Sequence, residues 1–369
     1  MYNTDMTETT TRQSKKSRWK LILNVVTVLV LALLVYGSRD QLGQTLSNLS
    51  RINGWILLLI IPIEVLNYHA QAKLYLHLFW IAGTKMAYKY LYRTALELNF
   101  VNYVFPSGGA AGTSYFGLTV RDGRKVTGGQ ATLVHLIKMA TVFISLEILI
   151  AFALLSLAIS NSVNGLLLLT AAVLSTVVLL VTIAFPYIIG SKKRINSLVT
   201  GTTAILNKII HYLRPHTPET INMTAAIETL NDFHDNYNQL KSKWRQLKTP
   251  LLYALMANAT EILALYVVYI AFGEYVNIGA VILAYAVANF AGLISVLPGG
   301  VGVYESLMIA VMASAGVPPG ISLPVTVTFR VVSTALQVPA GYFLYQSTMQ
   351  RRGLTKDELV DDMEHQHGA

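Results

Sequence analysis

Cysteine is absent from this chain of 369 residues, and charged residues make up only 13% of it. Without cysteine, neither disulfide bonds nor thiolate metal sites can stabilise the fold, so packing has to hold it together. A soluble domain carries about 25% charged residues, and this scarcity of charge argues against one. Hydrophobic residues reach 53%. The composition therefore predicts an all-α, polytopic membrane helix bundle.

The sequence also lacks the common enzyme motifs. It contains no Walker A sequence, no His-Glu-x-x-His, no Gly-x-Ser-x-Gly and no set of carboxylates at metal-ligand spacing. We therefore expect no catalytic residue, no metal and no cofactor, and we do not expect an enzyme. The net charge of +9 would suggest a nucleic-acid partner for a soluble protein. In a membrane protein the basic residues instead mark one side of the bilayer, so no nucleic acid is expected.

Crossing a hydrocarbon core of about 30 Å takes about 20 apolar residues in a helix. Seven stretches qualify: Trp19–Gly37, Trp55–Ala82, Ala131–Ile159, Gly165–Ile189, Leu251–Phe272, Ile278–Leu297 and Leu323–Gln346. Two further apolar stretches, Thr94–Phe105 and Ala111–Val120, are each too short to cross alone. They predict a re-entrant pair.

The basic residues predict the orientation. They gather in the N-terminal tail, in 83–93, 121–125 and 191–248, and in the C-terminal tail, whereas the opposite loops hold only Arg39 and Arg51. Under the positive-inside rule this places both termini in the cytoplasm of a multi-pass protein of the cell membrane. The re-entrant pair then enters from the cytoplasmic side.

These patterns divide the chain into five parts. We expect a cytoplasmic tail at 1–18, a first membrane half at 19–190 with a re-entrant segment at 94–120, a cytoplasmic amphipathic helical connector at 191–250, a second membrane half at 251–349 with a broken segment at 278–316, and a polar C-terminal tail at 350–369. The broken segment can be a second re-entrant pair or two full spans, and the distribution of charge allows both.

Two proline–glycine breaks interrupt apolar sequence in opposite halves, at 105–109 and at 297–302. Broken backbone at membrane depth survives only inside protein or beside a wet cavity, and paired breaks in two halves are typical of transporter binding sites. Asn99-Phe100 precedes the first break and Asn289-Phe290 precedes the second. We therefore predict an inverted repeat.

Ionisable residues inside spans are costly and usually face a bundle interior or a cavity. Arg330 lies in the last span and Glu305 shortly after the second break, so the two can meet, either to bind a lipid phosphate or to form a structural ion pair. Lys138 and Glu147 are about 13 Å apart along one helix and need other partners. Glu261 and Arg121 are candidates, and plain interhelical bonds are the alternative.

A second group of ionisable residues, Glu64, His69 and Lys73, falls within the span Trp55–Ala82. We expect the three to share one face of that helix and to form either a proton relay or a polar lining of the bundle.

The motifs Asn102-x-x-x-Pro106 with Gly108-Gly109, and Pro298-Gly299-Gly300-x-Gly302-x-x-Glu305 followed by Arg330, resemble those of the lysylphosphatidylglycerol synthase transmembrane family. The resemblance extends over roughly residues 20 to 346. It implies a flippase-like bundle that moves aminoacylated phospholipids, other lipids or polyprenyl-linked sugars between leaflets. This chain is expected to be a stand-alone member without the synthase domain.

We therefore expect a lipid translocase whose two broken segments form a cavity for a phospholipid or a polyprenyl-phosphate-linked lipid. A lipid-modifying transferase and a lipid-binding regulatory protein are the alternatives. The expected substrate-binding residues are Pro106, Ser107, Gly108, Gly109, Arg121, Lys138, Pro298, Gly299, Gly300, Gly302, Glu305 and Arg330. The expected proton or ion carriers are Glu147, Glu261 and Glu305. The partner is a membrane lipid, and a homo-oligomer or a separate lipid-modifying enzyme stays open.

Overall fold

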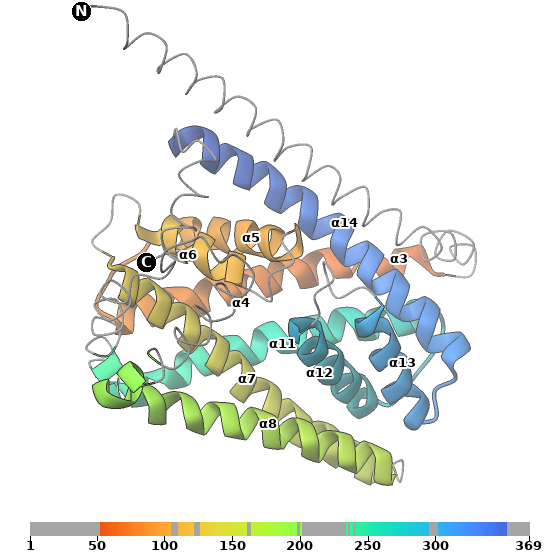
Figure 1. Ribbon diagram of the computed structural model, residues 1–369. Helices are drawn as coiled ribbons and strands as arrows, with labels where there is room; N and C mark the ends of the chain where they lie inside the picture. Colours follow the sequence, from red (N-terminus) through yellow and green to blue (C-terminus); the bar gives the residue numbers. More distant parts are fainter. Residues whose placement is uncertain are drawn as a thin grey trace, which may run out of the picture.

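A computed structural model describes residues 52–104, 110–121, 126–160, 164–197, 200, 234, 237–238, 241–294 and 302–352. These residues form helices and the short connections between them, and no strand is found among them. Five helical stretches are long and apolar enough to cross a membrane: Gly54–Ile81, Gly128–Ile159, Gly165–Ile189, Trp244–Ala271 and Pro319–Gln350. The chain is an all-helical, multi-pass membrane protein, and its long helices lie side by side in one bundle (Figure 1).

These five stretches coincide with five of the predicted spans. They contain α3 (Gly54–Leu57) with α4 (Ile60–Ile81), α7 (Gly128–Ile159), α8 (Gly165–Ile189), the 3₁₀ turn η2 (Trp244–Leu247) with α11 (Lys248–Ala271), and α14 (Pro319–Arg352). The predicted span Trp19–Gly37 lies outside the described residues. Most of the predicted amphipathic connector lies outside them too.

Four shorter helices form two pairs. One pair is α5 (Tyr88–Val104) with α6 (Ala110–Arg121), and the other is α12 (Ile278–Ile294) with α13 (Val303–Ser314). The stretch Ile278–Leu297, long enough by composition to span, thus forms a helix of 17 residues. A helix of 12 residues such as α13 rises only about 18 Å, which is too short to cross the bilayer.

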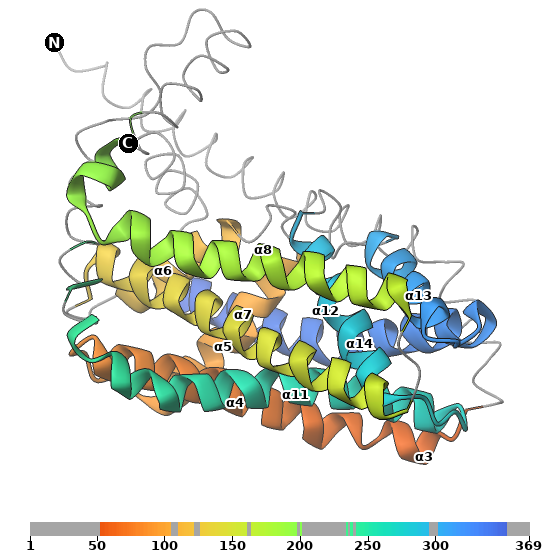
Figure 2. The same ribbon diagram turned by 90° about the horizontal axis from the view of Figure 1, so that it is seen from below.

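The two pairs attach to opposite ends of α7. At its start, Gln130 donates a hydrogen bond to the carbonyl oxygen of Ala82, in the connection between α4 and α5, over 2.8 Å. Near its end, Asn277, directly before α12, bonds Ser156 at 3.2 Å and Ser160 at 2.7 Å. With 32 residues, α7 is about 48 Å long. Figures 1 and 2 accordingly show α5 and α6 toward one end of the bundle and α12 and α13 toward the other.

Helix α4 stops at one end of the bundle, and we call this end the basic end. Lys85 follows α4 there, and the ammonium group of Lys243 donates to the carbonyl oxygen of Ile81 over 2.9 Å. Helix α14 runs toward the same end, because Thr334 bonds Tyr103 near the end of α5 whereas Thr348 bonds Glu97 in its middle. The described parts of the segments predicted to be cytoplasmic thus lie at one end of the molecule.

The two halves repeat the same lengths. Helices α5 and α12 both have 17 residues, and α6 and α13 both have 12. The start of α5 and the start of α12 are 190 residues apart, as are Gly83 and Gly273, which end the preceding long helices with φ values of 88° and 79°. Asn99 and Asn289 have the same separation. The Asn-Phe pairs that precede the two breaks therefore fall at equivalent positions of α5 and α12.

Buried apolar residues form two separate cores. One core lies toward the basic end and includes the apolar faces of α5 and α6, with the first part of α7 and the last part of α4. The other includes α12 and α13, with the last parts of α7 and α11. Each pair of short helices therefore has its own core, and the middle of the bundle lies between them.

Two glycines let helices of opposite halves approach closely. A Cβ atom at Gly341 of α14 would lie 2.6 Å from the Cβ of Phe100 and 2.7 Å from the carbonyl oxygen of Leu96, both in α5. A Cβ atom at Gly279 of α12 would lie 2.4 Å from the carbonyl oxygen of Ala153 in α7. Small residues permit such contacts between membrane helices. The contacts join α14 to α5 and α12 to α7.

We expect Gly341→Ala to destabilise the protein, because the added methyl group meets backbone atoms and forces α14 away from α5. Overpacking of this kind costs about 1–3 kcal/mol, and it is measured as a lower melting temperature of the purified protein in detergent. The control is Gly320→Ala in the same helix, where nothing lies within 4 Å of the added Cβ. Equal melting temperatures for the two variants would contradict the close contact.

Candidate functional site

Polar side chains cross the bundle between the two cores. They come from α4, α5, α7, α11, α13 and α14, and we call them the polar layer: Glu64, Asn67, Asn99, Ser145, Asn258, Thr260, Glu261, Glu305, Arg330 and Gln337. Asn67 donates to Ala257 and Thr260 of α11, and Asn258 donates to Ser145 of α7. Buried polar groups are costly in a membrane unless they are satisfied or functional. The layer is therefore the candidate site.

Glu305 and Arg330 meet, as the sequence predicted they could. The Nη1 atom of Arg330 lies 2.6 Å from Oε1 of Glu305, and both side chains are largely buried. The other carboxylate oxygen of Glu305 accepts the backbone N–H of Gly302 at 2.7 Å. Gly302 has a φ of 87°, a left-handed conformation that favours glycine. One carboxylate therefore fixes both the turn that begins α13 and the guanidinium on α14.

Arg330 lies between the helix ends that flank the two breaks. Its guanidinium stacks over the Tyr304 ring at 5.0 Å, in the first turn of α13 after the second break. Tyr103, one residue before the end of α5 at the first break, lies close enough to interact with it. Tyr103 also bonds Thr334, one turn after Arg330, at 2.7 Å. A guanidinium has five N–H donors in a planar fork, so this position suits binding of both a carboxylate and a phosphate.

Glu64 belongs to the same layer. Gln337 donates to both of its carboxylate oxygens, at 2.9 and 3.0 Å. Asn99 donates to Gln337 and to the Tyr68 hydroxyl, each at 2.7 Å. The sequence analysis missed this network, because its members are up to 273 residues apart in the chain.

The grouping of Glu64 with His69 and Lys73 was wrong. Five residues turn a helix by about 140°, so Glu64 and His69 face different neighbours. His69 bonds the Tyr88 hydroxyl at 2.8 Å, and Lys73 lies over the Tyr88 ring at 5.4 Å.

Two of the predicted ion carriers have little compensation for their charge. Glu261 lies close enough to Glu64 for the two carboxylates to interact electrostatically. Glu147 has a buried Oε2 atom without a hydrogen-bond partner in the described part of the chain. Like charges placed close together in an apolar setting repel each other. Glu305, by contrast, is neutralised by Arg330.

Lys138 and Arg121 lie apart from the Arg330 pair. Lys138 is half-buried on α7, with its ammonium 5.7 Å from the centre of the Tyr75 ring. His135, one turn earlier, bonds the Tyr75 hydroxyl at 2.9 Å. Arg121 ends α6 and is exposed. The structure brings together Gly302, Glu305 and Arg330, and it places these two basic residues elsewhere.

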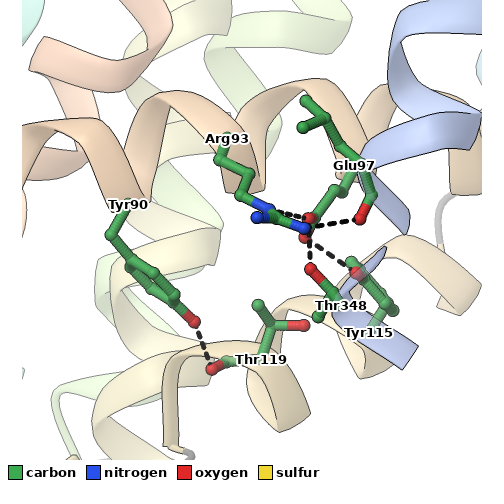
Figure 3. Close-up of polar contacts among 7 residues, drawn as sticks. Tyr90, Arg93, Glu97, Tyr115, Thr119 and Thr348 are labelled. Atoms are coloured by element: carbon green, nitrogen blue, oxygen red, sulfur yellow. Dashed lines mark hydrogen bonds and ion pairs between the residues drawn. The ribbon is translucent and has the colours of Figure 1, made fainter. Parts of the chain in front are cut away.

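A second polar cluster, the Glu97 clamp, joins α5, α6 and α14 (Figure 3). Glu97 accepts from Arg93 at 2.7 Å, from Tyr115 at 2.8 Å and from Thr348 at 2.5 Å. Arg93 also donates to the carbonyl oxygen of Leu344 over 2.8 Å. The clamp fixes the first pair of short helices to the last span, and sequence analysis missed it as well.

Seven predicted site residues lie outside the described residues: Pro106, Ser107, Gly108, Gly109, Pro298, Gly299 and Gly300. Their role as a binding site stays a prediction, which rests on the described residues on either side of each break.

Comparison with known proteins gives one consistent result. The sequence profile of the lysylphosphatidylglycerol synthase TM region family matches residues 21–341. The UPF0104 membrane protein MJ1595 of Methanocaldococcus jannaschii is 21% identical over 334 residues, which cover 89% of this chain and 94% of the relative. A UPF0104 membrane protein of Methanothermobacter thermautotrophicus is 32% identical over 97 residues, 26% of this chain and 29% of the relative. No solved structure matches the chain significantly.

Proposed function

This chain belongs to the lysylphosphatidylglycerol synthase TM region family, and from that premise we propose that it is a lipid translocase. Its substrate is a lipid that bears a phosphate, either a phospholipid or a polyprenyl-phosphate-linked lipid. The lipid headgroup crosses at the polar layer, while the apolar chains stay in the bilayer. No catalytic role is assigned to any residue.

The observation that carries the proposal is the position of Arg330. Its buried guanidinium lies between the end of α5 and the start of α13, the described residues that flank the two breaks, and it is the one cation among the side chains of the polar layer. Arginine matches the geometry of a phosphate and is weakly hydrated, so it can take a headgroup out of water. Glu305 keeps the charge compensated when no lipid is bound.

We also propose that the two short-helix pairs are re-entrant and that the halves form an inverted repeat. The equal lengths, the 190-residue offset and the attachment to opposite ends of α7 support this arrangement. In such transporters the substrate site lies near the midplane between the repeats. Rocking of one half against the other would open the polar layer first to one leaflet and then to the other.

With no nucleotide motif in the sequence, transport runs downhill or on an ion gradient. Glu261 is the carrier that we favour, because it shares the polar layer with Glu64 and is not neutralised by an arginine. The lipid headgroup and the coupling ion would then both bind within the polar layer.

The test is reconstitution into liposomes with fluorescent phospholipids and labelled polyprenyl-phosphate sugars. Reduction of the probes in the outer leaflet by dithionite measures their movement. We expect the protein to accelerate the exchange of at least one phosphate-bearing lipid over protein-free liposomes, and Arg245→Ala, which changes an exposed arginine of η2, to behave like wild type. If no lipid in the panel exchanges faster, the proposal fails.

A further inference from the structure

A groove of about 550 Å³ opens on the outside of the bundle between α4 and the base of α5. We call it the lateral groove. Its wall on α4 consists of Pro62, Val65, Leu66 and His69, and its wall on α5 consists of Tyr88, Lys89 and Tyr92.

The lining is ordered from apolar to basic. Val65 and Leu66 are 55% and 43% exposed, so they present bare hydrocarbon surface to whatever fills the groove. His69 follows one turn later and bonds Tyr88, while Lys73 lies over the same tyrosine ring. Lys89 is exposed at the first turn of α5. One end of the groove is thus apolar, and the other carries the amine of Lys89 and the imidazole of His69, with the amine of Lys73 beside it over the Tyr88 ring.

The depth of these residues follows from two exposed tryptophans on the first described span. Trp55 and Trp80 are 83% and 57% exposed, and exposed tryptophans are typical of the two membrane interfaces. They are about 38 Å apart along the helix, so Val65 and Leu66 lie near the bilayer centre. Helix α5 begins on the Trp80 side, because it follows the end of α4. His69 still lies near the bilayer centre, but Lys73 is only about 10 Å along the helix from Trp80. Because long lysine side chains extend toward the headgroups, the amines of Lys73 and Lys89 reach toward the leaflet on the Trp80 side.

The charge of the groove is unbalanced. None of its lining residues carries a carboxylate. The carboxylates of Glu64 and Glu261 belong to the adjoining polar layer, where Gln337 binds Glu64, and Arg93 binds Glu97. Basic side chains near the headgroups attract anionic lipids, by about 1 kcal/mol for each charge. A phospholipid phosphate is the anion that is always present at this depth.

We infer that the lateral groove binds one anionic glycerophospholipid, with its phosphate on Lys89 and Lys73 and an acyl chain along Val65 and Leu66. The amines lie on the side of the phosphate and the apolar residues on the side of the acyl chain, as in a lipid of the leaflet at the basic end. The groove adjoins the polar layer, since the Tyr92 ring lies 6.3 Å from the Tyr68 ring and Tyr68 bonds Asn99. As far as the groove supplies the translocated lipid, the inference rests on the proposed function.

The experiment uses the full-length protein in nanodiscs of phosphatidylcholine with a small share of phosphatidylglycerol that carries a diazirine in its acyl chain. After photolysis, peptide mass spectrometry locates the adducts. We expect adducts on Val65 and Leu66, and we expect Lys89→Glu to reduce them about fivefold or more. Lys85→Glu makes the same charge change at an exposed position outside the groove and should leave the adducts unchanged.

Equal adduct yields in the two lysine variants would overturn the inference, as would equal labelling by a phosphatidylcholine probe. Displacement of the probe by a polyprenyl phosphate, but not by unlabelled phosphatidylglycerol, would also overturn it. The melting temperature of Lys89→Glu shows whether the variant is folded. Because labelling is measured without transport, its success in liposomes that show no lipid exchange would refute the proposed function alone.

Discussion

Arg330→Ala abolishes lipid exchange in the liposome assay, with an expected loss of about 100-fold or more. Removing the guanidinium takes away the phosphate-binding cation and leaves Glu305 buried with an uncompensated charge. Breaking a buried ion pair on one side costs about 3–5 kcal/mol, which corresponds to more than two powers of ten in an equilibrium or rate constant. The melting temperature of the variant should fall with the loss of activity.

A paired variant separates the role of Arg330 in transport from its role in folding. Replacing Arg330 and Glu305 together by glutamine leaves two neutral side chains that can bond each other, so that no uncompensated charge stays buried. We expect the double variant to regain the wild-type melting temperature and to remain inactive. Recovery of lipid exchange in the double variant would show that the ion pair is purely structural and that the lipid binds elsewhere.

The second large effect concerns ion coupling. Glu261→Gln should abolish the response of lipid exchange to a transmembrane pH gradient, because an amide cannot take up the proton that the carboxylate exchanges. The stimulation lost is expected to be about fivefold or more, the range of ordinary coupling energies. Stability should stay equal or increase, since the substitution removes repulsion between Glu261 and Glu64. The rate of probe exchange with and without the gradient, together with the melting temperature, measures both effects.

Glu274→Gln is the matched control, since Glu274 follows the same helix but lies beyond its end, away from the polar layer. A Glu261→Gln protein that still responds to the gradient excludes Glu261 as the carrier. A protein that loses several degrees of melting temperature instead identifies this carboxylate as structural.

The sequence predicted best those features that a single physical requirement determines, such as the length of a span or the pairing of a buried charge. Apolar length predicted five spans within a few residues, because the bilayer imposes that length. The motif around Glu305 and a charged residue in the following span predicted their contact, because a buried charge needs a partner. The networks of Glu64 and Glu97 could not be found in this way. Their partners, such as Gln337 and Thr348, are common polar residues more than 250 residues away, and only the packing of α14 on α4 and α5 brings them together.

Helices of each half pack against helices of the other half, and this limits how the protein can fold and assemble. Helix α14 packs on α5 and α12 packs on α7, with Gly341 and Gly279 at the two contacts. Each pair of short helices is thus supported by a long helix from the other half, and a half on its own would lack these contacts. Under the inverted repeat proposed above, two copies of one half would restore these contacts as an antiparallel dimer, which requires a polypeptide that inserts into the membrane in both orientations.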